Sequence, residues 1–132
     1  MNHQLLIEKA FEARKRAYSP YSSFSVGAAL LSASGKIYTG CNIESVSHTP
    51  TCCAERVAFF KAVSEGERDF EAIAIVGAET SAEKFGFCAP CGVCRQVMSE
   101  FCDDDFKIIL ADSNGEQKIF TLAELLPFNF KL

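Results

Sequence analysis

Cysteines are concentrated in one short segment of the chain. The stretch FCAPCGVCRQ carries Cys88, Cys91 and Cys94, so that two C-x-x-C pairs overlap. The chain has seven cysteines, an odd number, and its first residues lack the apolar core of a signal peptide. A secreted disulfide framework is therefore not expected, and the cluster indicates metal or redox chemistry. Cys41 and Cys102 stand apart from it and are expected to be small buried hydrophobic residues.

Three kinds of site other than a catalytic metal centre could use these sulfurs. An iron–sulfur cluster of the bacterial ferredoxin type needs a fourth cysteine followed by proline, whereas Arg95 and Gln96 continue a helical pattern here. A thioredoxin-like redox pair fits CGVC locally but leaves Cys53 unexplained. A closed structural zinc site needs four protein ligands, with Cys52 or Cys88 as the fourth, although adjacent cysteines rarely both bind one ion.

A catalytic zinc site explains more of the pattern. Cys91 and Cys94 lie three residues apart at the start of a predicted helix, so their side chains share a face, and Cys53 opens another predicted helix. Three thiolates and one open position suit a hydrolytic zinc ion, and the positive ends of both helix dipoles favour thiolates. Glu55 can serve as the acid/base group if Cys53 lies at the helix edge; otherwise it is an ordinary helix N-terminal carboxylate. Cys88 is then expected to take no part.

The composition narrows the class of protein further. The chain has 132 residues, of which 48% are hydrophobic and 23% charged, and this suits one globular domain over residues 1–132. Its formal net charge of −4 argues against a nucleic-acid partner. No apolar run approaches the roughly 18 residues that a membrane span requires. We therefore expect a cytoplasmic protein that acts on a small molecule.

The elements that must position these residues follow from hydrophobic periodicity and turn signals. Helices are predicted over residues 2–18, from about 53 to 66, over 91–102, and briefly from 121 to 126. Strands are predicted over 24–31, 36–43, 71–78, 107–111 and 118–120. The third strand is almost continuously apolar and has helices before and after it, which is typical of a strand buried on both faces. An α/β fold with a mixed sheet between helices is expected.

Motifs along nearly the whole chain resemble those of the zinc-dependent cytidine deaminases. CAE at 53–55 and PCGVCRQV at 90–97 match the variant signature in which all three zinc ligands are cysteines. AYSPYSSFSVGAALL, GCNIES, AERVAFFKAVSEG and AELLPF are similar to the small homotetrameric members. The resemblance implies a cytidine deaminase-like α/β/α sandwich with a central five-stranded mixed sheet, one Zn²⁺ per subunit and a homotetramer. It also implies hydrolysis of cytidine and 2′-deoxycytidine to the uridines, a step of pyrimidine salvage.

The resemblance also implies roles for single residues around the ion. Cys53, Cys91 and Cys94 would hold Zn²⁺, and Glu55 would accept a proton from water, protonate N3 of the base and help to protonate the leaving amine. Three thiolates and one Zn²⁺ carry a net charge of 2 − 3 = −1, which makes the zinc a poorer acid. Arg56 would offset this charge through hydrogen bonds to the thiolates, unless it is a surface helical charge, and Arg95, beside Cys94, is the second candidate for this role.

On the substrate side, the resemblance implies contacts from five further residues. Asn42 and Glu44 would bind the sugar hydroxyls, although an asparagine after a strand is also a common turn residue. Phe24 would pack against the nucleoside, and the backbone N–H of Ala54 would bond the base carbonyl. Phe130 would cover the site of a neighbouring subunit.

Two features depart from the family pattern. His48 stands where many members carry an aromatic residue, in a loop that also contains Pro50 and Cys52. It is either an ordinary loop residue or a pH-sensitive residue of the pocket. Phe130 lies close to the last residue printed, which makes Phe128 the alternative for the aromatic that crosses to a neighbour.

Two other functions remain open on sequence alone. One is deamination of another amino-heterocycle, such as a nucleoside antibiotic of the blasticidin type. The pair Asn42 and Glu44 favours a ribose over it. The other is a non-catalytic, zinc-stabilised module, which would have no reason to place Glu55 beside the cysteines.

Overall fold

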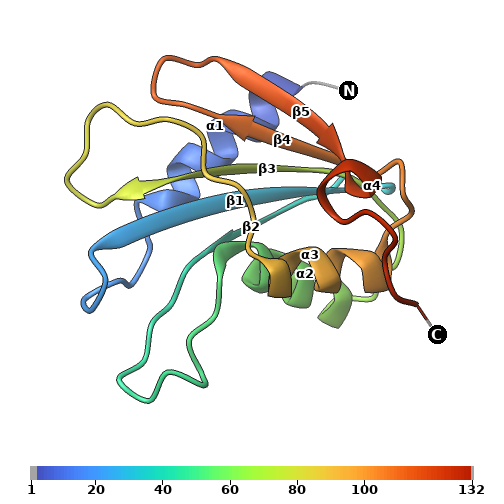
Figure 1. Ribbon diagram of the computed structural model, residues 1–132, viewed down its shortest axis with the longest axis horizontal. Coiled ribbons are helices and arrows are strands. Elements are labelled where there is room, and N and C mark those ends of the chain that lie inside the picture. Colours follow the sequence, from blue (N-terminus) through green and yellow to red (C-terminus); the bar gives the residue numbers. More distant parts are fainter. Residues whose placement is uncertain (1–2, 132) are drawn as a thin grey trace.

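The computed structural model describes residues 3–131, so the predicted domain over 1–132 extends slightly beyond the described part at both ends (Figure 1). The elements along the chain are α1 (His3–Arg14), β1 (Phe24–Ser32), β2 (Ile37–Cys41), α2 (Ala54–Ser64), β3 (Phe70–Glu79), α3 (Gly92–Phe101), β4 (Lys107–Ala111), β5 (Gln117–Thr121) and α4 (Leu122–Leu125). None of the helices in this part is long and apolar enough to cross a membrane.

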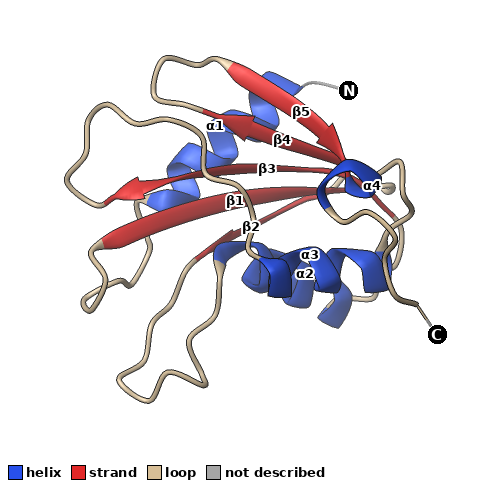
Figure 2. Ribbon diagram, in the orientation of Figure 1, coloured by secondary structure: helices blue, strands red, loops and turns tan. Residues whose placement is uncertain are grey.

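The five strands form one mixed sheet in the order β2-β1-β3-β4-β5 (Figure 2). β3 pairs with β1 antiparallel and with β4 parallel, while the outer pairs β1–β2 and β4–β5 are antiparallel. β3 is buried along almost its whole length, as its apolar sequence predicts. The parallel pair requires a crossover, and α3 supplies it.

Helices cover both faces of the sheet, which gives three layers. On one face, α1 packs Leu6, Ile7 and Ala10 against alanines and aliphatic residues of β1, β3 and β4. On the other face, α2, α3 and α4 bury Phe59, Met98 and other residues against the sheet in a larger core. In Figure 1, α1 lies behind the sheet, while α2 and α3 are drawn one in front of the other below β2.

Two predicted boundaries are wrong for a common reason. The first helix ends at Arg14 rather than near residue 18, because the chain turns and the backbone N–H of Tyr18 bonds the carbonyl of Asn42. β2 ends at Cys41 rather than 43, because Ile43 pairs through its backbone with Cys52. Tertiary pairing of loop segments thus overrides the local pattern.

Close contact between α2 and the sheet depends on Gly40 of β2. A Cβ at this position would lie 2.3 Å from the carbonyl oxygen of Ala54 and 2.6 Å from the backbone nitrogen of Ala58. The missing side chain therefore allows the first turn of α2 to lie directly on β2. This contact fixes the height of the α2 start above the sheet.

Candidate active site

The start of α2 and the start of α3 bring three sulfur atoms together. The Sγ atoms of Cys53, Cys91 and Cys94 all lie within 4.8 Å of one another, and those of Cys53 and Cys91 are 3.8 Å apart. Cys94 is buried, Cys53 is half-buried and Cys91 is exposed. The two helices begin next to each other in Figure 1. The predicted trio of sulfurs is therefore assembled, and all seven cysteines are free thiols.

Both helices begin immediately after a cysteine. Cys53 has an extended backbone (φ −69°, ψ 153°) and is the N-cap of α2, and Cys91 (φ −69°, ψ 167°) is the N-cap of α3. The Sγ of Cys91 accepts a hydrogen bond from the backbone N–H of Cys94 at 3.4 Å, in the manner of a capping side chain. Because Cys53 lies outside the regular helix, the condition for Glu55 to serve the same site is met.

The electrostatics of the cluster favour a thiolate at Cys53. Hydrogen bonds from the Cys94 thiol, and further ones from Arg56 and Cys91, lower the pKa of Cys53 to about 5. The guanidinium of Arg56 donates from Nη2 to Cys53 Sγ at 3.4 Å, and this contact raises the pKa of Arg56. The hydrogen bond that the Cys94 thiol donates to Cys53, together with burial, raises the pKa of Cys94. One sulfur of the cluster is thus held as a thiolate by the protons of its neighbours. A bound cation would stabilise the thiolate form of all three.

Glu55 is a buried carboxyl group beside these sulfurs. Only 5% of its surface is exposed. Burial raises its pKa to about 7, and the negative charge on Cys53 acts in the same direction. A carboxyl group that titrates near neutral pH can both accept and return a proton, as acid/base catalysis requires.

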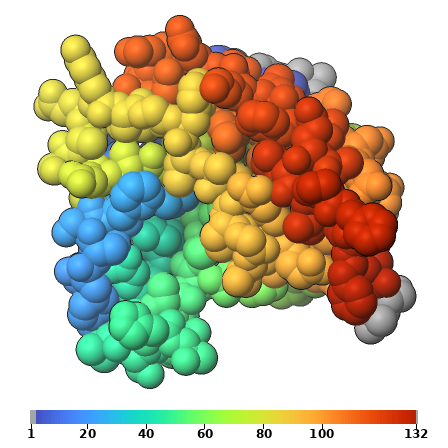
Figure 3. All heavy atoms as spheres, in the orientation of Figure 1, coloured from blue at the N-terminus to red at the C-terminus, as the bar shows by residue number. Residues whose placement is uncertain are grey.

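A pocket of about 340 Å³ opens onto this cluster. Its wall is formed by residues from three parts of the chain: Ser22, Phe24, Val26, Asn42, Glu44, Thr51, Cys52, Cys53, Ala54, Glu55, Cys88, Ala89 and Cys91. Figure 3 shows these parts adjoining on one face, the first in blue, the second in green and the third in yellow to orange. The pocket has the size of a small-molecule site. It joins Phe24, Asn42, Glu44 and Ala54 to the sulfurs and Glu55, as the sequence analysis predicts.

Comparison with known proteins identifies the family. Residues 1–110 match the family described as the cytidine and deoxycytidylate deaminase zinc-binding region. The chain belongs to the cytidine deaminase family. The cytidine deaminase of Halalkalibacterium halodurans is 50% identical over 130 residues, covering 98% of this chain and 95% of that protein. The cytidine deaminase of Sporosarcina psychrophila is 48% identical, covering 98% and 92%.

The fold agrees with that family. The crystal structure of cytidine deaminase from Burkholderia pseudomallei matches with a TM-score of 0.89 at 45% identity, covering 98% of this chain and 100% of that one. The predicted family, enzyme class, α/β/α fold and zinc cofactor are confirmed, and the relatives favour a cytidine deaminase over the two other functions considered.

The donor atoms of this deaminase site fit one zinc ion. Three thiols close together from two helix starts are the ligand type that Zn²⁺ prefers. Neither Cys52 nor Cys88 belongs to the cluster, although both line the pocket. Three protein ligands rather than four distinguish a catalytic zinc site from a closed structural one.

Asn42 and Glu44 have partners within the protein as well as a place on the pocket wall. The side-chain oxygen of Asn42 accepts from the backbone N–H of Val26 at 2.9 Å, and its amide donates to the carbonyl of Phe24 at 2.8 Å. Glu44 accepts from the backbone N–H groups of Tyr21 and Ser22 and from the Ser22 hydroxyl. These bonds lower the pKa of Glu44, with the Ser22 hydroxyl as the largest cause. Asn42 thus holds the strand that carries Phe24.

Three predicted or considered residues lie elsewhere. Arg95, the second candidate for offsetting thiolate charge, donates instead to the carbonyls of Pro90 and Leu125 at 2.8 and 2.7 Å. His48 lines a separate hollow of about 250 Å³ that shares Ser22, Glu44 and Thr51 with the deaminase pocket. Phe130 is 68% exposed and lies against the end of α3, where its carbonyl accepts from Gln96.

Two residues of the pocket wall lie outside the predicted set. Val26 lies two residues after Phe24 on one strand, so that both side chains face the same way. Cys88 was expected to take no part, and it takes none in the sulfur cluster, yet it lines the pocket. The approach of residues 88 and 89 to β1 and β3 is a tertiary contact with no local sequence signal.

Proposed function

We propose that this chain catalyses the hydrolytic deamination of cytidine and 2′-deoxycytidine to uridine and 2′-deoxyuridine, with release of ammonia. The observation that carries the proposal is the buried carboxyl group of Glu55 beside the three-sulfur cluster, where both line a pocket of about 340 Å³. The relatives named above support cytidine as the parent substrate.

Cys53, Cys91 and Cys94 would hold the zinc ion, which when bound supplies a Lewis acid that makes water a better nucleophile near neutral pH. Glu55 accepts the proton that water loses as its oxygen bonds to C4 of the base, and passes it to N3. The hydroxyl now on C4 then loses its proton, and the same carboxyl group delivers it to the exocyclic amine as the C4–N bond breaks and the carbonyl at C4 forms. The pKa of about 7 suits Glu55 to this alternation.

The pocket wall would orient the nucleoside. The backbone N–H of Ala54, at the first turn of α2, has no intrahelical partner and can donate to the carbonyl at C2 of the base. Phe24 packs against the nucleoside, and the free lone pairs of the Glu44 carboxylate and the second amide hydrogen of Asn42 bind the sugar hydroxyls. Arg56 offsets the negative charge of the thiolates through Cys53.

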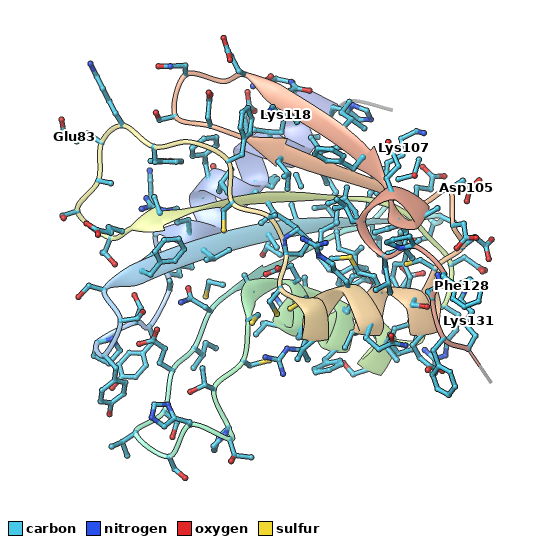
Figure 4. The ribbon with its side chains drawn as sticks, viewed as in Figure 1. Glu83, Asp105, Lys107, Lys118, Phe128 and Lys131 are labelled. Carbon is cyan, nitrogen blue, oxygen red and sulfur yellow. The ribbon has the colours of Figure 1, made fainter. Side chains whose placement is uncertain are left out.

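We infer that four copies of the chain assemble. Phe60 of α2 and Val93 of α3 are 48% and 58% exposed and line an apolar hollow of about 450 Å³ together with Val97 and Phe101. Exposed apolar surface of this kind marks a protein interface. Phe130 does not line the pocket of its own subunit, and its exposed side chain can cover the pocket of a neighbour. The fully exposed Phe128 is the alternative (Figure 4).

We further propose that the chain acts in the cytoplasm, in pyrimidine salvage, as one domain over residues 1–132. Seven free thiols suit a reducing compartment. An enzyme with a formal net charge of −4 suits free nucleosides rather than polynucleotides.

The test is direct. The purified protein should deaminate cytidine and deoxycytidine, which is followed by the change in ultraviolet absorbance, and chelation of zinc should abolish the activity. Glu55→Gln should lower kcat by about 10²- to 10⁴-fold while zinc content is retained. Glu65→Gln, an exposed carboxylate at the end of the same helix, is the matched control. Retained activity in Glu55→Gln would contradict the proposal.

A further inference from the structure

Cys88 remains unexplained by the mechanism although it lines the pocket. Its thiol packs against β1 and β3: a Cβ built on Gly77 would lie 2.8 Å from Cys88 Sγ and 2.9 Å from Cγ2 of Val26. The thiol therefore occupies the space that a side chain at 77 would need, next to Val26. Cys88 and Val26 both line the pocket. Together they form a continuous apolar part of its wall.

This wall and the start of α2 come from different segments of the chain that meet at the pocket. Glu55 and Ala54 reach the pocket from α2, whereas Cys88 and Ala89 belong to the segment that leads into Cys91 and α3. The carbon that reacts, C4, has two ring neighbours, N3 and C5, on opposite edges of the base. With N3 at Glu55, as the proposed function requires, C5–H is the remaining apolar edge beside C4, and the apolar wall at Cys88 and Val26 is the part of the pocket that suits it.

We propose that Cys88 is a specificity-determining residue, whose side-chain volume limits the size of the substituent on C5 of the cytosine that the enzyme accepts. The inference rests on the proposed function and adds the substrate class to it: cytosine nucleosides with hydrogen at C5, with 5-alkylated ones discriminated against.

The chemistry of the wall supports a steric role for this residue. Burial raises the pKa of the Cys88 thiol to about 11, so the side chain is neutral and offers bulk rather than charge. Cys88 cannot readily retreat, because Gly77 and Val26 lie directly behind it. Interiors packed this closely respond to a change of one methyl group. One methyl group in such a pocket typically changes discrimination by about 10- to 200-fold.

The experiment compares kcat/KM for cytidine with kcat/KM for 5-methylcytidine in the zinc-loaded enzyme. Cys88→Ala makes room, so the ratio should fall about tenfold, and Cys88→Val adds a methyl group, so the ratio should rise. Val26→Ala opens the same wall and should lower the ratio as well, which keeps the test decisive if one Cys88 variant fails to fold. Cys41→Ala, a thiol outside the pocket, is the matched control and should leave the ratio unchanged.

The possible results distinguish a failure of the proposed deaminase function from a failure of the proposed role of Cys88. A wild-type enzyme that does not deaminate cytidine would overturn the proposed function itself. A wild-type enzyme that deaminates cytidine, with a ratio that does not follow side-chain volume in the series Ala, Cys, Val at residue 88, would overturn only the role of Cys88. A shift in Cys41→Ala as large as that in Cys88→Ala would do the same.

Discussion

At the scale of single residues, the site brings together ionisable groups whose burial costs solvation energy. Glu55 is a buried carboxyl group, and Cys53 is a half-buried thiol with a strongly lowered pKa. Such shifted groups concentrate at functional sites, because burial and close charges are needed to produce them. Arg56 provides the compensating positive charge, and its Nε, buried among the described residues, has no hydrogen-bond partner. The guanidinium is thus held at the sulfurs although one of its donors is left unpaired.

Arg56 should therefore matter for zinc rather than for folding. Arg56→Ala removes the donor 3.4 Å from Cys53 Sγ, and loss of such a partner of a metal ligand typically weakens metal affinity about 10- to 100-fold. Competition with a chromophoric chelator measures this affinity, and circular dichroism checks the fold. Arg16→Ala, at an exposed position in the turn after α1, should change neither. Unchanged zinc affinity together with unchanged kcat in Arg56→Ala would remove the role.

The hydrogen bonds of Glu44 should make the thermal stability of the protein depend on pH. Hydrogen bonds from Ser22 and Tyr21 lower its pKa, so the folded state favours the carboxylate more than the unfolded state does. The stabilisation is therefore complete above the unfolded pKa and is lost as pH falls through the folded pKa. Glu44→Gln should melt at a lower temperature than the wild type at neutral pH, and the difference should shrink towards about pH 3. Glu83→Gln, whose side chain points away from the molecule in Figure 4, should show no such trend.

At the scale of elements, the sequence predicts the features that neighbouring residues determine, but not the element ends that contacts with distant residues determine. The three sulfurs, Glu55 and the strand that carries Phe24 were all predicted, because helix starts and strand alternation leave a signal in neighbouring residues. The end of α1 and the pairing of Ile43 with Cys52 were missed, since backbone partners far along the chain decide them. Cys88 lies outside the ligand pattern, and that pattern carries no information about which residues line a pocket wall.

The contact between β2 and α2 can be tested through Gly40. In Gly40→Ala the new Cβ would meet the backbone of α2, so α2 must move away and carry Cys53 with it. We expect a loss of about 1–3 kcal/mol in the free energy of unfolding and weaker zinc binding. Urea denaturation and zinc titration measure the two effects. Gly86→Ala, where a Cβ meets nothing within 4 Å, should be tolerated. Wild-type behaviour of Gly40→Ala would show that α2 does not depend on this contact.

At the scale of the whole molecule, one face of the sheet carries only a packed core, whereas the other carries the helices that form the site. α1 covers one face with a compact, alanine-rich core and contributes no residue to the pocket wall. The other face carries α2 and α3, and these helices bear both the sulfurs and the exposed apolar hollow at Phe60 and Val93. The proposed assembly would therefore join subunits through the same helices that hold the site.

A charge in that hollow should break the assembly. Phe60→Asp places a carboxylate where the proposed interface excludes water, and the tetramer should dissociate into smaller species. Light scattering coupled to size-exclusion chromatography measures the mass, and kcat shows whether a neighbour's aromatic side chain is needed. Ile119→Asp, at a similarly exposed position on β5, should remain tetrameric. A wild-type protein that elutes as a monomer would contradict the assembly outright.

The sulfur cluster also joins two parts of the chain that are otherwise remote along it. Cys53 and Cys91 are 38 residues apart, and β3 lies between their helices. A divalent ion bound there would close the loop between the two helix starts. Its loss would increase the conformational entropy of both helix starts at the same time. Chelation should therefore accelerate hydrogen–deuterium exchange in the first turns of α2 and α3 together, while α1, on the far side of the sheet, keeps its protection. The bound cofactor would then stabilise the starts of both helices in addition to taking part in the reaction.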